Sequence, residues 1–153
     1  MRFHRCNLDQ MFNWVAIFNF HSHTDIHVFA IDSPSVWVTD TEALMIVNGG
    51  RVIHCDQGER LPLVYVSFLE VAPWNRVGSQ NRQRLRGLGI AMLRAACDLA
   101  MQLGFDGRIG LHSLPASEGF YRRLGFLGLD CPNEYNEMYF ELSEAGVEVL
   151  MRD

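Results

Sequence analysis

The spacing of apolar residues along the first third of the chain predicts one helix and two short strands. Apolar positions recur at helical spacing between residues 8 and 20, and the polar segment 21–27 follows as a loop. Two short apolar stretches, 28–31 and 36–39, predict strands. Residues 32–35 between them have the composition of a turn.

A β-hairpin and a long strand are predicted next. The apolar segments 43–47 and 51–55 flank Asn48-Gly49-Gly50, and these residue types adopt the positive φ angles that a tight turn requires. The run 61–71 is almost continuously apolar and rich in strand-forming residues. We therefore expect a central strand that is covered on both faces and ends before Pro73.

Helices and strands alternate in the second half. Apolar residues at helical spacing predict a helix over 88–103, which Gly104 ends in a positive-φ conformation. The further elements expected are a strand over 108–114, a helix over 115–124, a strand over 136–142 and a terminal helix capped by Ser143. This strand–helix–strand order favours parallel pairing with right-handed crossovers.

Length and composition indicate one globular domain that spans residues 1–153. Hydrophobic residues make up 48% and charged residues 20% of the chain, which excludes a disordered or collagen-like protein. No apolar run approaches the roughly 18 residues of a membrane span. The first residues also lack the apolar core of a signal peptide. We therefore expect a cytoplasmic protein without a membrane partner.

Neither the cysteines nor the histidines predict a resident metal. The four cysteines lie far apart with no C-x-x-C pair, so we expect free thiols. The segment 21–27 nearly matches the H-x-H-x-D-H start of metallo-β-lactamase-like hydrolases. Ile26 stands at the final ligand position, however, and His27 comes one residue late. We expect no metal site.

Positive charge gathers in one part of an acidic chain. All 13 basic residues are arginine, and the formal net charge is −5. Residues 76–108 carry six arginines against two acidic residues, a net charge of +4, whereas the segments on either side are both negative. A basic island of this size predicts one local anionic ligand rather than a nucleic-acid surface.

The segment 82–90, Arg-Gln-Arg-Leu-Arg-Gly-Leu-Gly-Ile, predicts a phosphate site. Gly87 and Gly89 stand where a loop becomes a helix, so a phosphate there would meet no Cβ atom. The first helical turn offers unpaired N–H groups at the positive end of the helix dipole. Neither a P-loop nor a dinucleotide fingerprint fits, because the chain has no lysine and position 92 is methionine.

Two motifs in order resemble the GCN5-related N-acetyltransferases. The spacing Arg84-x-x-Gly87-x-Gly89 after a long central strand is similar to the family's glycine-rich motif, and 119–126 is similar to its Tyr-x-x-x-Gly-Phe element. Residues 69–76 resemble the strand end of a bacterial branch. The resemblance covers 61–142 well and implies an α/β, mixed-sheet acyl-CoA N-acyltransferase fold with a shortened N-terminal part.

The resemblance also implies roles for individual residues. Acetyl-CoA would be the cosubstrate, with its pyrophosphate on Arg84, Arg86, Gly87, Leu88, Gly89 and Ile90. Tyr121 would be the general acid on the CoA sulfur, and the Val71 N–H would stabilise the oxyanion. Ser113 or the backbone would supply a pantetheine contact, because Leu114 stands where many members have asparagine.

Glu70 is the candidate general base, since it is the lone carboxylate in an apolar strand, where desolvation favours its neutral form. The alternative placements are toward solvent or in a pair with an arginine. Trp74 and Tyr65 are suggested for the acceptor pocket. No cysteine is placed by a motif as a nucleophile, so direct transfer is expected.

These inferences predict an enzyme that transfers acetyl from acetyl-CoA to a primary amine of a small molecule or protein. The main alternative is an acyl-CoA-binding module without turnover. A nucleic-acid-associated protein is the further rival, but the narrow basic segment argues against a nucleic-acid partner. Late strands in this family often complete a two-chain sheet. The segment 136–142 is therefore expected to be an exposed edge, and the protein a homodimer.

Overall fold

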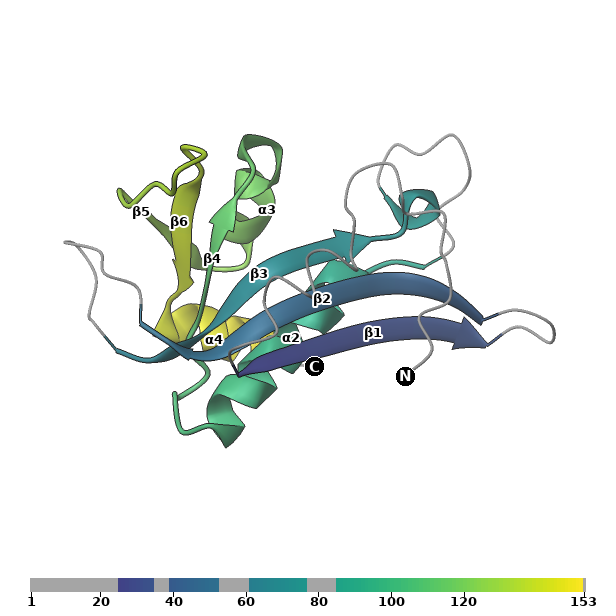
Figure 1. The fold of residues 1–153 in the computed structure, drawn as a ribbon, viewed down its shortest axis with the longest axis horizontal. Helices are drawn as coiled ribbons and strands as arrows, with labels where there is room; N and C mark the ends of the chain where they lie inside the picture. Colours follow the sequence, from purple (N-terminus) through teal and green to yellow (C-terminus); the bar gives the residue numbers. More distant parts are fainter. Residues whose placement is uncertain (1–24, 35–38, 53–60, 77–84, 153) are drawn as a thin grey trace.

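The computed structural model describes residues 25–34, 39–52, 61–76 and 85–152 (Figure 1). Its strands are β1 Ile26–Pro34, β2 Thr39–Arg51, β3 Leu63–Val71, β4 Ile109–Ser113, β5 Phe126–Leu129 and β6 Met138–Leu142. Its helices are α2 Leu88–Gln102, α3 Glu118–Arg123 and α4 Glu144–Met151, with 3-10 turns η1 Pro73–Asn75 and η2 Pro115–Ser117. The helix expected over 8–20 lies outside the described residues.

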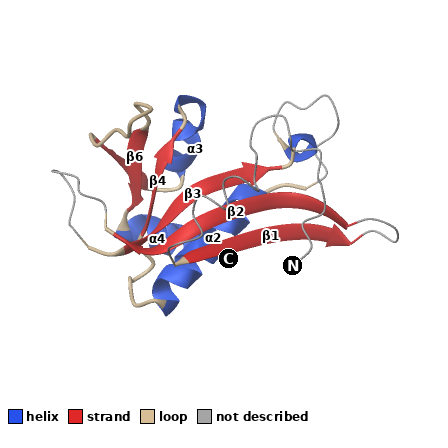
Figure 2. Ribbon diagram, in the orientation of Figure 1, coloured by secondary structure: helices blue, strands red, loops and turns tan. Residues whose placement is uncertain are grey.

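The strands form one mixed sheet in the order β1-β2-β3-β4-β6-β5 (Figure 2). Only β3 and β4 pair in parallel among the described strands; the other neighbours are antiparallel. The expected mixed-sheet α+β fold is confirmed. The parallel pairing of β3 and β4 follows from the crossover through α2, whereas β6 reverses direction beside β4.

Helix α2 packs on one face of the sheet because its apolar residues fall on one side. Its buried members include Met92, Leu93, Ala96 and Ala100, which join strand residues such as Val64 in the main core. A second, smaller cluster of Leu63, Tyr65 and Tyr139 lies in the sheet apart from this core. Successive side chains of β3 therefore alternate between the main core and this smaller cluster on the other face of the sheet.

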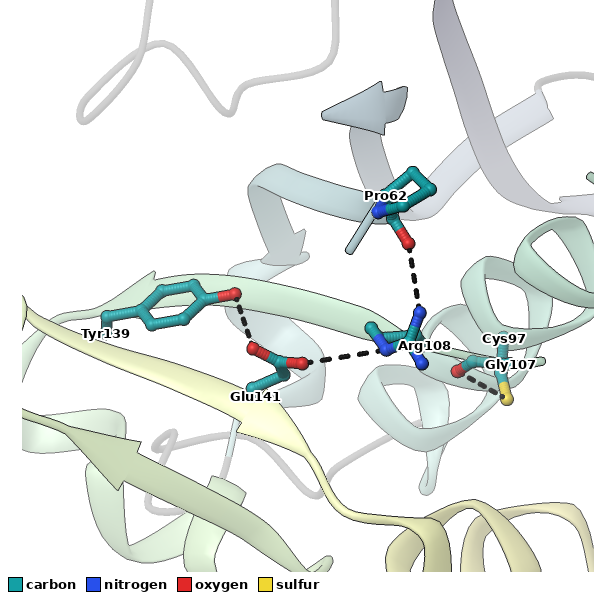
Figure 3. Close-up of polar contacts among 6 residues, drawn as sticks. All are labelled: Pro62, Cys97, Gly107, Arg108, Tyr139 and Glu141. Atoms are coloured by element: carbon teal, nitrogen blue, oxygen red, sulfur yellow. Dashed lines mark hydrogen bonds and ion pairs between the residues drawn. The ribbon is translucent and has the colours of Figure 1, made fainter. Parts of the chain in front are cut away.

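Polar contacts tie together the ends of the strands where β3 and β4 begin (Figure 3). The Arg108 guanidinium donates to the Pro62 carbonyl at 3.3 Å and lies 3.8 Å from the Glu141 carboxylate. The Tyr139 hydroxyl donates to that carboxylate at 3.1 Å, and the backbone N–H of Val64 donates to the Arg108 carbonyl at 3.1 Å. These contacts hold β3, β4 and β6 together at this end of the sheet.

The hairpin predicted at Asn48-Gly49-Gly50 is wrong. Strand β2 runs through these residues, and Asn48 pairs with Ile26 of β1. The Gly49 N–H donates to the Asp25 carbonyl at 2.8 Å, and the positive φ of Gly50 accommodates an irregularity in the pairing with β3. The glycines bend a continuous strand because neighbouring strands supply its partners.

Two further expectations change at the end of the chain. The sequence pattern did not predict β5, and residues 136–142 were expected at an exposed edge, whereas β6 lies between β4 and β5. The edge expectation is wrong because the missed four-residue strand occupies that position. Ser143 caps α4 as predicted, accepting from the Gly146 N–H at 3.0 Å. No helix in the described part is long and apolar enough to span a membrane.

Candidate active site

The central feature of the candidate site is the separation of β3 from β4. The two strands pair only at Val64–Ile109 and Tyr65–Gly110. Beyond that point β3 continues to Val71 beside β2, while β4 continues beside β6, and their arrowheads point apart in Figure 1. The last backbone groups of β3 on this side therefore have no β4 partner, and an extended ligand could hydrogen-bond to them.

Val71 directs its backbone groups toward the side from which β4 has separated. The next residue, Ala72, donates its N–H to the Glu42 carbonyl of β2 at 2.9 Å. Because successive residues of a strand point their N–H and C=O groups to alternate sides, those of Val71 point away from β2. The Val71 carbonyl accepts from Arg76 Nε at 3.0 Å. Its N–H also points to the side that β4 leaves, where the sequence predicts an oxyanion donor.

Gly87 and Gly89 open helix α2 for different physical reasons. Gly87 is the N-cap residue and has φ of 74°, a backbone conformation that residues other than glycine adopt only at a cost in free energy. A Cβ at Gly87 would meet nothing within 4 Å, whereas one at Gly89 would lie 3.3 Å from Phe120 of α3. Close packing against Phe120 therefore accounts for Gly89.

The first turn of α2 has no capping partner among the described residues. None of their side chains caps the helix, and no acidic residue lies in its first turn. Leu88 is buried and Ile90 half-buried, so their side chains pack inward, and Arg86 is exposed before the cap. This 15-residue helix directs the positive end of its dipole to an uncapped start beside an arginine, which favours an anion. Arg84 lies outside the described residues.

A buried carboxylate that sequence analysis missed anchors the segment between β3 and α2. Glu42 of β2 is 1% exposed and accepts hydrogen bonds from Ser33, Trp74 and Asn75 at 2.5 to 2.7 Å. Asn75 also accepts from the Leu85 N–H at 2.8 Å. The network therefore positions the residues that lead into Gly87. An acidic residue beside the apolar run 43–47 was the available signal.

Tyr121 of α3 lies in the core with its ring against three phenylalanines. Phe120 and Phe126 meet it edge-on at 5.2 and 5.5 Å between ring centroids, and Phe140 lies 6.2 Å away. Burial raises the pKa of the Tyr121 hydroxyl from 10.0 to about 12. The phenol therefore stays protonated at neutral pH and can donate a proton or a hydrogen bond.

Glu70 lies on the other face of β3 from Leu69 and Val71, which pack against the main core. Glu70 is 8% exposed, and its Oε1 lies 2.5 Å from Arg76 Nη2. This is the arginine pairing that the sequence left open as an alternative to the role of base. Tyr121 belongs to the main core, so the two proposed catalytic side chains approach from opposite faces of the sheet.

The other residues predicted for the site already have hydrogen-bond partners within the protein. Ser113 is buried at the end of β4, and its hydroxyl donates to the Leu114 carbonyl at 2.9 Å. Tyr65 shares a 2.7 Å hydrogen bond with His112 Nδ1, and Trp74 donates to Glu42. Burial lowers the pKa of His112, which sequence analysis did not single out. The structure thus brings Glu70, Val71 and Arg76 together, whereas Tyr65 belongs to a separate cluster.

Comparison with known proteins gives structural relatives alone. No family model and no curated protein matches the chain. The KacTA–DNA complex matches with a TM-score of 0.59 at 17% identity, over 93% of this chain and 86% of that one. A mutant AtaT toxin bound to the C-terminus of the antitoxin AtaR and to acetyl-CoA matches with a TM-score of 0.59 at 14% identity, over 92% and 80%. The chain has the fold of the GCN5-related N-acetyltransferases.

A third structure, AtaTR bound with acetyl-CoA, matches with a TM-score of 0.54 at 15% identity, over 93% of this chain and 86% of that one. Identities this low establish the shared fold. The motif resemblance of the sequence is thereby confirmed as a resemblance of fold.

The expectation that the protein has no nucleic-acid partner is wrong. KacTA, a protein of the same fold, forms a structure with DNA. The expectation relied on the narrow basic segment and on a net charge of −5. Nucleic-acid binding depends on how cations are arranged locally and in an assembly, so net charge does not exclude it.

Within the described residues, no group of three or more histidine, cysteine or acidic side chains could hold a metal ion. The segment 21–24 with its two histidines lies outside that part of the chain. His27 of β1 has its Nε2 3.2 Å from Asp25, the residue just before that strand. Cys97 and Cys131 are free thiols. Cys97 is buried, and burial raises its pKa to about 11, so it is a poor nucleophile.

Proposed function

We propose that the protein is an N-acetyltransferase that moves an acetyl group from acetyl-CoA directly to a primary amine. The observation that carries the proposal is the separation of β3 from β4 beside the uncapped start of α2. Two structures of the same fold contain acetyl-CoA, which supports the choice of cosubstrate.

Each part of acetyl-CoA has a physical counterpart in this arrangement. The N–H groups of Leu88 and Gly89, helped by the Arg86 guanidinium, would bind the pyrophosphate at the positive end of α2. The extended pantetheine amides would hydrogen-bond to the backbone of β3 on the side that β4 leaves. This binding mode would bring the thioester carbonyl near the Val71 N–H at the end of β3, where a hydrogen bond would stabilise the developing oxyanion.

The transfer requires two proton movements. The neutral amine nitrogen attacks the thioester carbon, forming the N–C bond, and the C–S bond breaks as the tetrahedral intermediate collapses. Glu70 would accept the proton that the amine loses. Tyr121 would donate a proton to the departing CoA thiolate and then regain one from solvent.

The pKa of about 12 for Tyr121 limits its acidity but keeps it protonated. A thiolate leaves without full protonation more readily than an amine does, so a hydrogen bond from the phenol is useful even when the proton moves late. The rival function, an acyl-CoA-binding module, would bind the cosubstrate and release no CoA with any amine.

The test is release of free CoA, followed with a thiol reagent, across a panel of primary amines. Tyr121→Phe removes one hydroxyl and keeps the ring packing, so kcat should fall about 10²–10⁴-fold while acetyl-CoA affinity stays unchanged. Tyr135→Phe is the matched control, because Tyr135 is 75% exposed and should leave kcat unaltered. An undiminished kcat in Tyr121→Phe would refute its role as the acid. Tight acetyl-CoA binding without turnover would favour the binding module.

A further inference from the structure

The ion pair between Glu70 and Arg76 leaves one carboxylate oxygen and several guanidinium N–H groups without a partner among the described residues. Glu70 Oε1 contacts Arg76 Nη2 at 2.5 Å, but Glu70 Oε2 is buried and accepts no hydrogen bond from the residues that the structure describes. Arg76 donates from Nε to the Val71 carbonyl and from Nη2 to Glu70 Oε1. A guanidinium has five N–H donors, so three have no partner among the described residues, and the side chain is 41% exposed.

An unsatisfied oxygen on a buried carboxylate is unusual and costly. The same sheet shows how this chain satisfies a structural carboxylate: both oxygens of Glu42 accept hydrogen bonds, from Ser33, Trp74 and Asn75. Glu70 pairs with Leu44 in the register of β2 and β3, two residues along from Glu42, yet the described part of the chain offers its Oε2 no donor. The missing donor is therefore expected from a ligand.

We propose that the acceptor is a free α-amino acid or a molecule that ends in one, with its amine on Glu70 Oε2 and its carboxylate on Arg76. The proposal rests on the proposed acetyl transfer and names the substrate class of that site. An ammonium supplies the donor that Oε2 lacks. A carboxylate accepts the unused N–H groups of the guanidinium, which is the pairing that arginine geometry favours.

The spacing of the two protein groups selects an α-amino acid. Glu70 and Arg76 are in direct contact, so the two charges they bind must also be adjacent. In an α-amino acid one carbon joins the ammonium and the carboxylate. A polyamine offers a second positive charge where Arg76 already stands, and like charges at this range repel. The protein pair has no net charge and thus complements a zwitterion rather than a cation.

The chemical step keeps its atoms and protons balanced. The ammonium gives one proton to Glu70 Oε2, and the resulting amine forms the N–C bond to the acetyl carbon as the C–S bond breaks. The second proton leaves the nitrogen as the amide forms and passes to solvent. CoA leaves as a thiol after accepting the Tyr121 proton. The product keeps its carboxylate and loses its positive charge, so it no longer matches Glu70 and can dissociate.

The experiment compares kcat/KM for matched acceptors: L-methionine, L-phenylalanine and L-glutamate, each against its α-carboxamide, with spermidine as a third class. Charge-assisted hydrogen bonds to one carboxylate should favour at least one free amino acid over its amide by about 10- to 100-fold. Arg76→Gln should reduce this ratio to about twofold or less, and Arg76→Lys should restore part of it. Arg152→Gln is the matched control, since Arg152 is 75% exposed and pairs only with Glu148 among described side chains.

A separate readout excludes the possibility that Arg76 serves acetyl-CoA instead. The KM for acetyl-CoA should change less than about twofold in Arg76→Gln; a loss confined to acetyl-CoA affinity would overturn the inference. Equal rates with amino acids and amides, or a preference for spermidine, would overturn it while leaving the acetyltransferase intact. If acetyl-CoA fails to bind the wild-type protein, the proposed function fails at its first step. If Arg76→Gln does not fold, the Lys variant and the wild-type acceptor ratio decide.

Discussion

Two glycines at opposite ends of α2 provide a controlled test of the phosphate site. Gly87 at the start has φ of 74°, Gly104 after the end has φ of 80°, and an added Cβ meets nothing within 4 Å at either position. Replacing either with aspartate costs the same backbone strain, about 1–2 kcal/mol. In a domain of this size that lowers Tm by about 2–8 °C. The two variants differ in which end of α2 receives the charge.

The expected outcome separates binding from stability. A carboxylate at position 87 interacts favourably with the helix dipole, whereas one near the C-terminal end does not, so Gly87→Asp should be at least as stable as Gly104→Asp. Acetyl-CoA at 100 times its Kd stabilises a protein by about 2.7 kcal/mol, or about 5–11 °C here. Gly104→Asp should keep this rise. Gly87→Asp should lose it, because the carboxylate occupies the space of the pyrophosphate and repels it.

Thermal unfolding with and without acetyl-CoA measures both quantities in one experiment. An undiminished rise in Gly87→Asp would refute the assignment of the pyrophosphate to α2. An equal loss in both variants would show that the effect comes from damage to the helix rather than from the site.

Three further predictions follow from the same contacts. Asn75→Ala removes a donor to buried Glu42 and the acceptor of the Leu85 N–H before α2, so Tm should fall. In steady-state kinetics the KM for acetyl-CoA should rise severalfold with kcat little changed, and a fall in kcat alone would contradict this. Val71→Pro deletes the N–H that points away from β2 and should lower kcat about 10²–10³-fold. Ala72→Pro deletes the hydrogen bond to the Glu42 carbonyl and should mainly lower Tm. The reverse pattern would refute the oxyanion role of Val71. Folding raises the pKa of Tyr121 from 10.0 to about 12, so its contribution of roughly 3 kcal/mol to the free energy of unfolding is present below pH 10 and is lost as pH rises to about 12. In urea unfolding at high pH, the stability of Tyr121→Phe should therefore depend less on pH than that of the wild type. Parallel pH profiles would contradict the raised pKa.

Local sequence signals determined the second half of the fold. Apolar residues at helical spacing and a following glycine predicted a helix over 88–103, and α2 is Leu88–Gln102 with Gly104 at positive φ. Ser143 was recognised as a cap because its role depends on a hydrogen bond to a residue three positions away. The motif around Gly87 identified the fold for the same reason: the loop and the helix start are contiguous in sequence.

Tertiary structure decided the features that depend on partners far away in the chain. Asn48-Gly49-Gly50 has the composition of a hairpin turn, yet β1 and β3 supply partners that hold it within one strand. The place of β6 inside the sheet was set by β5, a strand too short to be predicted from its own residues. In both cases pairing energy from neighbouring strands overrides local preference.

The candidate site divides along the same line. Gly87, Val71 and Tyr121 were predicted as site residues because each belongs to a local motif, whereas the Glu42–Asn75 network joins residues 33 positions apart and carries no such pattern. Burial and the pairing with Arg76 decide how Glu70 can act, since a carboxylate in an apolar strand is compatible with a base, a structural ion pair or a ligand contact. Sequence names the charged group, but the electric environment of that group depends on which side chains folding brings within hydrogen-bond distance.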